Sequence, residues 1–437
     1  MGRGIVLCLL VVAAFPAAGV YAQDAPPSAG TEDGSAAPGT GPVTIPPPSE
    51  QAVRFYTSGI ALWLIREAWG LLVPVVILFT GLSAKIRTAS QRAGRYWFFT
   101  VAIYAAIYSV LGFVVDLPLS YYAEFVRLHT YGLSNQTLTK WATDSATGLA
   151  VGAVVAALFL WVPYLLLTKS PKRWWLYTGL LMYAFFALTF FVKPILIDPL
   201  FNEFGPMQDK ALEQKILALA DRAGIDGGKV YEVNKSADTK TYNAYVTGIL
   251  QTSRIVLWDT TIKGLSEGQL LFVMAHEMGH YVLGHVYSGI AFMGTLMLFG
   301  FYVIHRASGW IIARYKDRLG FDQLSDVASY PLILFLLGAT MFALDPISNA
   351  YSRYHEHEAD RFGLELTQDN HAAASAFVKL FQENLGYPNP HPLVKLWRAT
   401  HPPLGERVAF CNEYKPWTSG GPLTYGRLFR AANDAGK

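Results

Sequence analysis

The stretch "MAHEMGHYVLGHVYSGIAFMGTLMLFGFYVI", residues 274–304, joins a polar motif directly to a long apolar run. In the motif, His276 and His280 are four residues apart and lie on either side of Glu277. Residues four apart share one face of a helix, so the two imidazoles can point at one metal ion. The apolar run, 286–304, is long enough to cross a bilayer core of about 30 Å. The stretch therefore predicts a membrane helix with a polar site just beyond one end.

The composition of the whole chain also indicates a membrane protein. Of its 437 residues, 52% are hydrophobic and only 15% are charged, which is too apolar for an ordinary soluble enzyme. A net charge of +3 gives no indication of nucleic-acid binding, and the lipid bilayer is the expected partner. Beyond the N-terminus, six runs can span a bilayer: 61–84, 97–118, 147–168, 174–196, 286–304 and 328–345.

The N-terminal segment reads as a signal followed by a tether. Residues 1–22 have one basic residue, Arg3, then an apolar stretch, then "VYA" before Gln23 as a cleavage site. An uncleaved signal anchor is the alternative. Residues 23–55 are rich in Pro, Gly, Ser and Ala and predict an extended tether. Because Cys8 lies in the signal, the mature chain keeps one cysteine and no internal disulfide is expected.

Basic residues predict which way the bundle faces. Three stretches are rich in Lys and Arg: "KIRTASQRAGR" (85–95), "KSPKR" (169–173) and the loop 306–318 after the fifth run. By parity all three lie on one side of the membrane, and Lys and Arg concentrate in short cytoplasmic loops. The segment 197–285 and everything after residue 346 are therefore expected on the other, extracytoplasmic side.

A catalytic zinc site needs a third protein ligand, and the stretch "NAYSRYHEHEAD" (349–360) offers the best candidates. Glu356 and Asp360 are four apart and can share a helix face, one to bind the metal and the other to orient an imidazole. Glu358 points roughly the opposite way. His355 flanks the ligand face obliquely and is the alternative ligand.

The two histidines and Glu356 are predicted to lie at the same height above the membrane. His276 and His280 precede the fifth run by six to ten residues, and Glu356 follows the sixth run by about ten. At 1.5 Å per helical residue, both sets lie about 10–15 Å beyond the same membrane face. Two antiparallel membrane helices would therefore carry the ligands to one level.

With these residues placed, the chain resembles the type I CAAX prenyl protease family of integral-membrane zinc metalloendopeptidases, which are zincins with a glutamate ligand. One departure is that Arg127, Leu128 and Tyr131 stand where the family usually has acidic and His residues. Seven stretches follow in the family's order: 121–137, 194–207, 236–260, 276–285, 320–323, 352–360 and 401–407.

The resemblance implies roles for the residues around the metal. It makes His276, His280 and Glu356 the ligands of one zinc ion per chain. Glu277 is the implied general base and acid of peptide hydrolysis, and Asp360 is implied to orient a ligand.

The resemblance also implies residues that contact the substrate. Asn243, Ala244 and Tyr245 are expected on an edge strand that receives the substrate backbone. His401 is a candidate catalytic residue and Arg407 a candidate substrate-binding residue, and the role of each is charge stabilisation or support of a metal ligand. Both, with Tyr245, are candidates to hold the oxyanion, and an ordinary packing role is the alternative for Tyr245 and Arg407.

The expected fold is mainly α, a polytopic membrane bundle of about six transmembrane helices plus the signal segment, with a zincin-like α+β metalloprotease domain. A four-helix transmembrane region covers 56–196 and a transmembrane hairpin covers 286–346. The protease domain comes in two parts, 197–285 with the "HEMGH" helix and 347–437 with the third ligand. In these parts we expect helices over 207–225, 369–385 and 391–399 and strands over 229–234 and 254–259.

These features predict a zinc-dependent endopeptidase in a bacterial inner membrane, with its catalytic domain on the extracytoplasmic side. Its substrates would be membrane-associated peptides or proteins, including CAAX or prenyl-type peptides, in the processing or quality control of envelope proteins. No obligate protein partner is expected. A transporter would need ionisable residues deep inside the apolar runs, where few occur. A catalytically inactive scaffold would have lost Glu277 or a ligand, and this chain keeps them.

Overall fold

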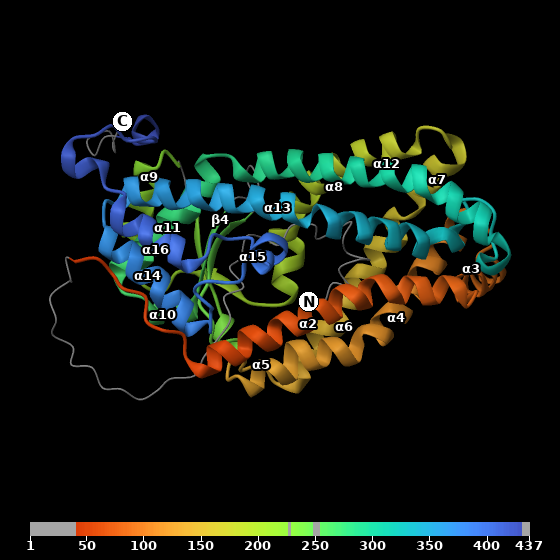
Figure 1. Cartoon of the computed structure of the whole chain (residues 1–437), viewed down its shortest axis with the longest axis horizontal. Helices are drawn as coiled ribbons and strands as arrows, with labels where there is room; N and C mark the ends of the chain where they lie inside the picture. Colours follow the sequence, from red (N-terminus) through yellow and green to blue (C-terminus); the bar gives the residue numbers. More distant parts are fainter. Residues whose placement is uncertain (1–40, 226–228, 248–253, 431–437) are drawn as a thin grey trace.

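The computed structural model describes residues 41–225, 229–247 and 254–430 (Figure 1). The predicted signal and most of the predicted tether lie outside these residues. The predicted end of the tether at residue 55 is wrong, because the first described helix, α2 (Glu50–Phe79), already begins at Glu50. Ser49 caps it by accepting a hydrogen bond from the backbone N–H of Ala52, and the three prolines before Ser49 keep the chain extended up to that cap.

Six helices of the described part are long and apolar enough to cross a membrane, which confirms the predicted bundle. The helix α6 is continued by α7 within one span, and α4 by a short π-helical turn and α5 (Arg127–Thr130). Besides α2, the spans are built on α4 (Trp97–Ser120), α6 (Leu138–Phe159) with α7 (Trp161–Lys169), α8 (Trp174–Val192), α12 (His285–Leu319) and α13 (Tyr330–Thr367).

The last two membrane helices extend far beyond their apolar runs. The stretch 306–318, predicted as a loop, is helical because α12 continues to Leu319 and ends where Gly320 adopts a left-handed conformation, with φ of 72°. The second of these helices, α13, runs unbroken from the membrane part to Thr367 and carries the predicted third ligand. The basic residues of α3 (Leu82–Ala93) and of the end of α12 lie at the end of the molecule opposite the protease domain (Figure 1).

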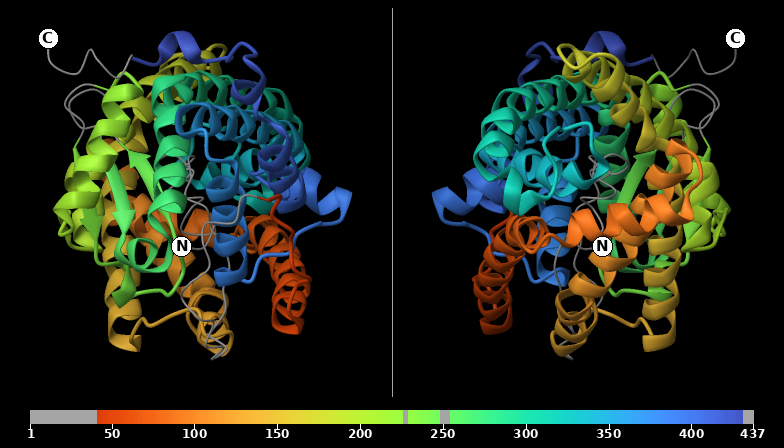
Figure 2. Two further views of the ribbon diagram at one scale, coloured as in Figure 1. Left: turned by 90° about the vertical axis from the view of Figure 1, so that its left-hand side faces the viewer. Right: turned by 90° about the vertical axis from the view of Figure 1, so that its right-hand side faces the viewer.

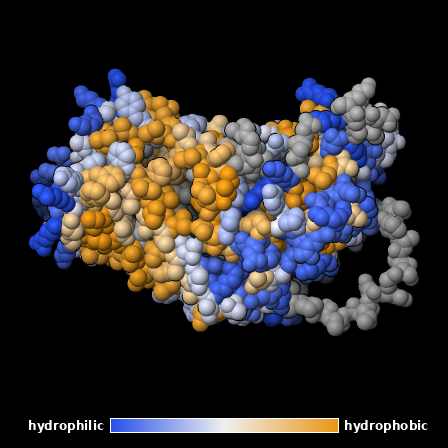
Figure 3. All heavy atoms as spheres, turned by 180° about the vertical axis from the view of Figure 1, so that it is seen from behind, coloured by the Kyte–Doolittle hydropathy of each residue, from blue (hydrophilic) through white to orange (hydrophobic). Residues whose placement is uncertain are grey.

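Two separate hydrophobic cores correspond to the bundle and the protease domain. The bundle core includes the buried side chains of Tyr104, Trp174 and Met297, and the domain core includes those of Phe272 and Phe362. On the face seen in Figure 3, a broad apolar zone covers the bundle, whereas the protease domain is mainly hydrophilic. The apolar zone is the surface that a bilayer would cover.

A four-stranded sheet lies on one side of the protease domain, and the C-terminal helices lie on the other (Figure 2, left). The strand order is β1-β2-β4-β3, so β3 forms one edge. β2 and β4, which correspond to the predicted strands, pair in parallel, and the other pairs are antiparallel. The strands are β1 (Phe204–Pro206), β2 (Val230–Val233), β3 (Ala244–Thr247) and β4 (Arg254–Trp258).

The helices of the protease domain pack around α11 (Glu267–Val282), which contacts β3 on one side and α13 and α14 on the other. Three predicted helices are observed with somewhat shorter bounds. They are α9 (Lys210–Arg222), α14 (Asn370–Glu383) and α15 (Pro392–Arg398), and α10 (Asp259–Gly264) and α16 (Leu404–Glu413) complete the set.

Candidate metal centre

The helix α11 is largely buried and has a well-capped N-terminus, and it carries the two histidines. A capping box begins it, in which Ser266 accepts from the backbone N–H of Gln269 and the Gln269 side chain accepts from the backbone N–H of Ser266. One helical turn separates His276 from His280, and their Nε2 atoms lie 3.2 Å apart. The two imidazole nitrogens therefore converge on one point.

Two glycines allow α11 and α13 to cross with their backbones almost in contact. A Cβ atom on Gly279 would lie 3.1 Å from the Cβ of Phe362 and 3.2 Å from the Cα of Ala359. A Cβ on Gly363 would lie 3.1 Å from the backbone nitrogen of His276. These close approaches hold the second predicted ligand segment directly against the histidines.

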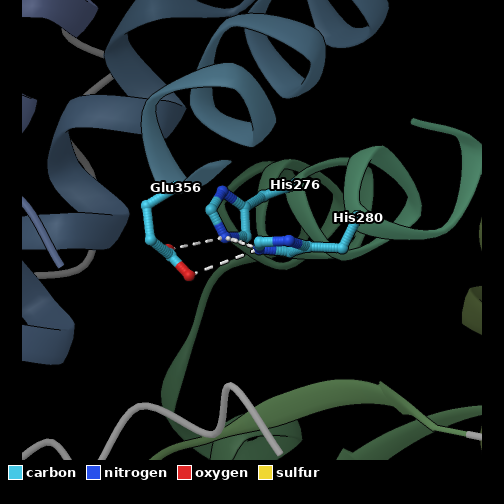
Figure 4. Close-up of side chains that lie close together, drawn as sticks. All are labelled: His276, His280 and Glu356. Carbon is cyan, nitrogen blue, oxygen red and sulfur yellow. Dashed lines mark hydrogen bonds and ion pairs between the residues drawn. The ribbon is translucent and has the colours of Figure 1, made fainter. Parts of the chain in front are cut away.

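Glu356 of α13 completes the group (Figure 4). One of its carboxylate oxygens lies 3.4 Å from Nε2 of His276, and the other lies 3.4 Å from Nε2 of His280. It is the only group of three or more metal-binding side chains in the described part of the chain, and its ligand atoms lie within 4.8 Å of one another. The structure thus brings together the three residues predicted as ligands.

The donor atoms of this group fit a zinc ion. Zinc bonds of about 2.0–2.1 Å in tetrahedral geometry place neighbouring ligand atoms about 3.3 Å apart, close to the observed separation of the two imidazole nitrogens. Glu356 is only 1% exposed, yet its Oε2 atom has no hydrogen-bond partner. A buried carboxylate oxygen without a partner is costly, and a cation would satisfy it.

Asp360 supports the first histidine from behind. Its Oδ1 lies 2.8 Å from Nδ1 of His276, and the guanidinium of Arg407 binds both of its oxygens, with Nε 2.9 Å from Oδ2. Burial alone would lower the pKa of His276, but Asp360 and Glu356 raise it to about 10. The two carboxylates therefore stabilise positive charge at this imidazole. A bound metal cation would supply that positive charge.

Arg407, a candidate substrate-binding residue, binds Asp360 and also lies 3.7 Å from the Glu356 carboxylate. It is 8% exposed, and its guanidinium also lies 3.8 Å from the ring centre of Phe377. Burial would lower the pKa of Arg407, but the Asp360 carboxylate raises it, so the side chain stays charged. Its position suits a role in holding Asp360, and the predicted contact with substrate stays a prediction.

Glu277 is buried beside the candidate ligands without being one of the three. It is 5% exposed, and burial raises the pKa of its carboxyl group. The backbone of Val246 on β3 lies near this carboxyl group and offsets part of the rise in its pKa. A carboxyl group with a raised pKa, held between the metal group and the edge strand, suits proton transfer near neutral pH.

His401 approaches the group from the segment before α16. Its Nε2 lies 3.3 Å from Oε1 of Glu356, and its Nδ1 lies 2.8 Å from the Thr400 hydroxyl. Burial lowers the pKa of His401, which favours the neutral imidazole. The predicted catalytic histidine is thus at the site, on the side of the carboxylate.

The three residues predicted for a substrate-binding strand lie at the start of β3. Asn243 directly precedes the strand and is anchored by the Thr261 hydroxyl, 2.6 Å from its backbone nitrogen. Ala244 and Tyr245 pair with β4 on one side, and the other side of β3 is the edge of the sheet. Burial raises the pKa of the Tyr245 hydroxyl, and the negative charge of Asp198 raises it further.

One contact of the site escaped sequence reasoning. His285, the first residue of α12, has its Nδ1 atom 2.8 Å from Nδ1 of His280. Gly284 makes this contact possible by a left-handed turn, with φ of 69°, between α11 and α12. A metal-binding histidine generally uses its second ring nitrogen for an orienting contact, so a partner for His280 could have been expected.

The alternative residues of α13 lie elsewhere. The His355 ring packs against His285, with 4.1 Å between ring centres, and against Tyr351. Glu358 accepts from the Tyr425 hydroxyl and pairs with Arg361 at 3.1 Å, on another side of the helix. Neither residue belongs to the group of three metal-binding side chains.

The fold and this group define a membrane-embedded metallopeptidase of the zincin type. Comparison with known families agrees. The family described as "CAAX prenyl protease N-terminal, five membrane helices" matches residues 50–203, and "Peptidase family M48" matches residues 206–415. The chain belongs to peptidase family M48, is an integral membrane metalloendopeptidase, and as such requires a metal, generally zinc in this family.

Similar proteins span most of the chain. The Bacillus subtilis protein "Uncharacterized metalloprotease YhfN" is 39% identical, over 84% of this chain and 86% of the relative. "CAAX prenyl protease 1" of Saccharomyces cerevisiae is 28% identical over 70% of each chain. The crystal structure of S. mikatae Ste24p has a TM-score of 0.71 and 24% identity, covering 82% of this chain and 87% of that one. At that identity the match demonstrates the fold alone, and it confirms the predicted membrane bundle with its protease domain.

Proposed function

We propose that His276, His280 and Glu356 bind one zinc ion per chain and that Glu277 is the general base of peptide hydrolysis at this centre. The observation that carries the proposal is the convergence of two imidazole nitrogens, 3.2 Å apart, on a buried carboxylate that has one oxygen without a hydrogen bond. Bound zinc would act as a Lewis acid that polarises a carbonyl group and makes water acidic near neutral pH.

The remaining chemistry falls to side chains of this chain. Glu277, whose pKa is raised by burial, takes the proton of the attacking water and then delivers it to the leaving amine. Asp360, held by Arg407, fixes the ring of His276. His401, neutral and directed at the same carboxylate, is placed to donate a hydrogen bond to the oxyanion.

The edge of β3 that pairs with no other described strand is the proposed place for the substrate backbone. An extended peptide can add to an exposed strand through main-chain hydrogen bonds. Asn243, Ala244 and Tyr245 would receive it, and the contact of Val246 with Glu277 would place the scissile bond near the base. This arrangement suits cleavage within a chain, because the edge strand can hold peptide on both sides of the cleaved bond.

The substrates in this proposal are membrane-associated peptides or proteins, with prenyl-type peptides as one class. Support for that class is the similarity to proteins named CAAX prenyl protease 1. The bilayer position of the enzyme limits its substrates to chains that reach the membrane surface. No nucleic acid and no obligate protein partner enter the proposal.

For location, we infer a bacterial inner membrane with the protease domain on the extracytoplasmic side. Support comes from the basic end of the bundle, formed by α3 and the end of α12, which lies opposite that domain (Figure 1). Similarity to a Bacillus subtilis protein supports a bacterial origin. This side of the membrane makes envelope proteins the substrates for processing or quality control. A reporter that works only outside the cytoplasm should be active after Lys437 and silent after Ser90; the reverse would refute this orientation.

The decisive variant for the catalytic role is Glu277→Gln. Because Glu277 is not a proposed ligand, zinc content should stay at one per chain, while peptide hydrolysis should fall about 10²–10⁴-fold. Glu267→Gln, an exposed glutamate on the same helix, is the matched control and should keep full activity. Zinc analysis and hydrolysis assays on detergent-purified protein check both. Normal hydrolysis by Glu277→Gln would exclude it as the base.

A further inference from the structure

The short helix α15 lies outside the six spans, at the junction of the bundle and the protease domain (Figure 1). Several hydrogen bonds fasten it to α13. Among them, Asn349 donates to the Leu396 carbonyl at 3.3 Å, and the Trp397 ring nitrogen donates to the Phe342 carbonyl at 3.2 Å. Helix α15 therefore has a fixed height relative to the membrane helices.

That height matches the ends of two of the apolar runs. The Trp397 ring lies 6.4 Å from that of Phe342, near the end of the sixth apolar run, and Phe342 lies 6.4 Å from Trp63, near the start of the first. Aromatic side chains gather where membrane meets water. We therefore expect these three rings, and α15 with them, at the surface of the bilayer.

The exposed side chains of α15 include two leucines. Leu393 and Leu396, one turn apart, are 61% and 37% exposed. Ile347 and Tyr354, two turns apart on α13, are 54% and 61% exposed. A helix with exposed leucines at the boundary buries them in the outer part of the bilayer, as interfacial helices do.

A hollow of about 360 Å³ opens beside α15, with more basic than acidic side chains. Arg353 reaches it and donates to the carbonyls of Lys395 and Ala399, at 3.0 and 2.7 Å. Among the described residues, Glu406 is the only acidic side chain that lines it, and it pairs with Lys395. The full lining is Ala350, Arg353, Tyr354, His357, Lys395, Pro402, Glu406 and Arg407.

We propose that α15 and this hollow form a binding site for an anionic phospholipid, with Leu393 and Leu396 against the acyl chains and the phosphate headgroup beside Lys395 and Arg353. Basic side chains at a membrane surface attract anionic headgroups, and exposed leucines beside them favour a lipid over a soluble anion. The segment that follows α15 carries His401, so the lipid would also steady the approach of that residue to Glu356.

Lipid binding can be measured on the full-length protein in nanodiscs of phosphatidylcholine with added phosphatidylglycerol, by native mass spectrometry. Lys395→Gln should weaken retention of phosphatidylglycerol about fivefold, the effect of one basic residue near an anionic surface. Glu406→Gln should strengthen it by a similar factor, because the carboxylate that competes for Lys395 is gone. Lys379→Gln, which breaks a comparable ion pair with Glu383 on α14, should change nothing.

The opposite signs separate lipid binding from a structural ion pair. If Lys395 and Glu406 only stabilise the fold, both variants act in the same direction and the proposal fails. Inorganic phosphate, added to nanodiscs of phosphatidylcholine alone, should not occupy the site. Phosphate binding that depends on Lys395, without preference for phosphatidylglycerol, would make this a site for free anions and overturn the lipid assignment.

Depth provides a separate readout. A bimane label on Leu393→Cys should be strongly quenched by brominated lipid. The same label on Leu428→Cys, an exposed leucine near the C-terminus, should not be quenched. Equal quenching at the two positions, or none at Leu393→Cys, would contradict the placement of α15 in the bilayer surface.

Discussion

Helix α13 buries two glutamates nine residues apart, Glu356 and Glu365, and each is 1% exposed. Glu365 is fully hydrogen-bonded: its oxygens accept from the backbone nitrogens of Thr424 at 2.8 Å and Tyr425 at 2.7 Å, and from the Tyr414 hydroxyl. Glu356 instead faces imidazole rings and keeps one oxygen without a hydrogen bond. Burial alone therefore does not identify a functional carboxylate. A buried carboxylate oxygen that lacks a hydrogen bond does.

The two glutamates serve different parts of the domain. Glu365 fastens the C-terminal segment around residues 414–425 to α13, so its contacts are structural. Glu356 lies where α13 crosses α11, so its contacts converge on the metal group. Substituting each by glutamine, which keeps the shape and removes the charge, separates the two roles.

The largest effect is expected for Glu356→Gln. The amide is a poor metal ligand, so metal affinity should fall by more than the roughly 10–100-fold typical of losing a supporting residue, and hydrolysis should fall with it. Glu365→Gln should keep one zinc per chain. Zinc titration against a competing chelator measures both. Full zinc retention by Glu356→Gln would break the distinction and make His355 the next ligand to test.

A smaller effect is expected for Arg407→Gln. Without the guanidinium, Asp360 loses the partner that orients it toward His276, and metal affinity should fall about 10–100-fold. Arg407→Lys should recover only part of this, because lysine cannot bind both oxygens at once. Arg361→Gln, which breaks the pair with Glu358, is the control and should bind zinc normally. Wild-type affinity in Arg407→Gln would show that Asp360 holds His276 without help.

The smallest of the three is the stability cost of Glu365→Gln. Its NH₂ group would face backbone N–H donors, leaving buried polar groups unpaired at a cost of about 1–3 kcal/mol. The thermal midpoint should drop by several degrees while zinc binding is kept. Glu383→Gln, which removes an exposed ion pair, should have little effect. A loss of zinc without a loss of stability in Glu365→Gln would reverse the two roles.

The membrane helices, and the grouping of His276, His280 and Glu356, could be predicted from the sequence. Apolar length identifies membrane helices, and helical spacing places His276 and His280 on one face. The distance of Glu356 from its apolar run then predicts its height. Each of these inferences is local or depends only on helix rise.

The remaining features depend on contacts that spacing does not encode. Arg407 meets Asp360 across 47 residues, and no local pattern pairs them. His285 reaches His280 only because Gly284 redirects the chain into a new helix. The end of α12 was misplaced because a helix ends at its cap and not at its last apolar residue, so charged residues continue it into water.

Zinc K-edge X-ray absorption on the purified protein tests the central claim most directly. The account predicts nitrogen and oxygen neighbours at about 2.0–2.1 Å, with the outer scattering of two imidazole rings. In His280→Ala, any zinc that remains should show only one. A wild-type spectrum with three imidazoles would contradict the account, because it would make His401 or His355 a ligand in place of Glu356.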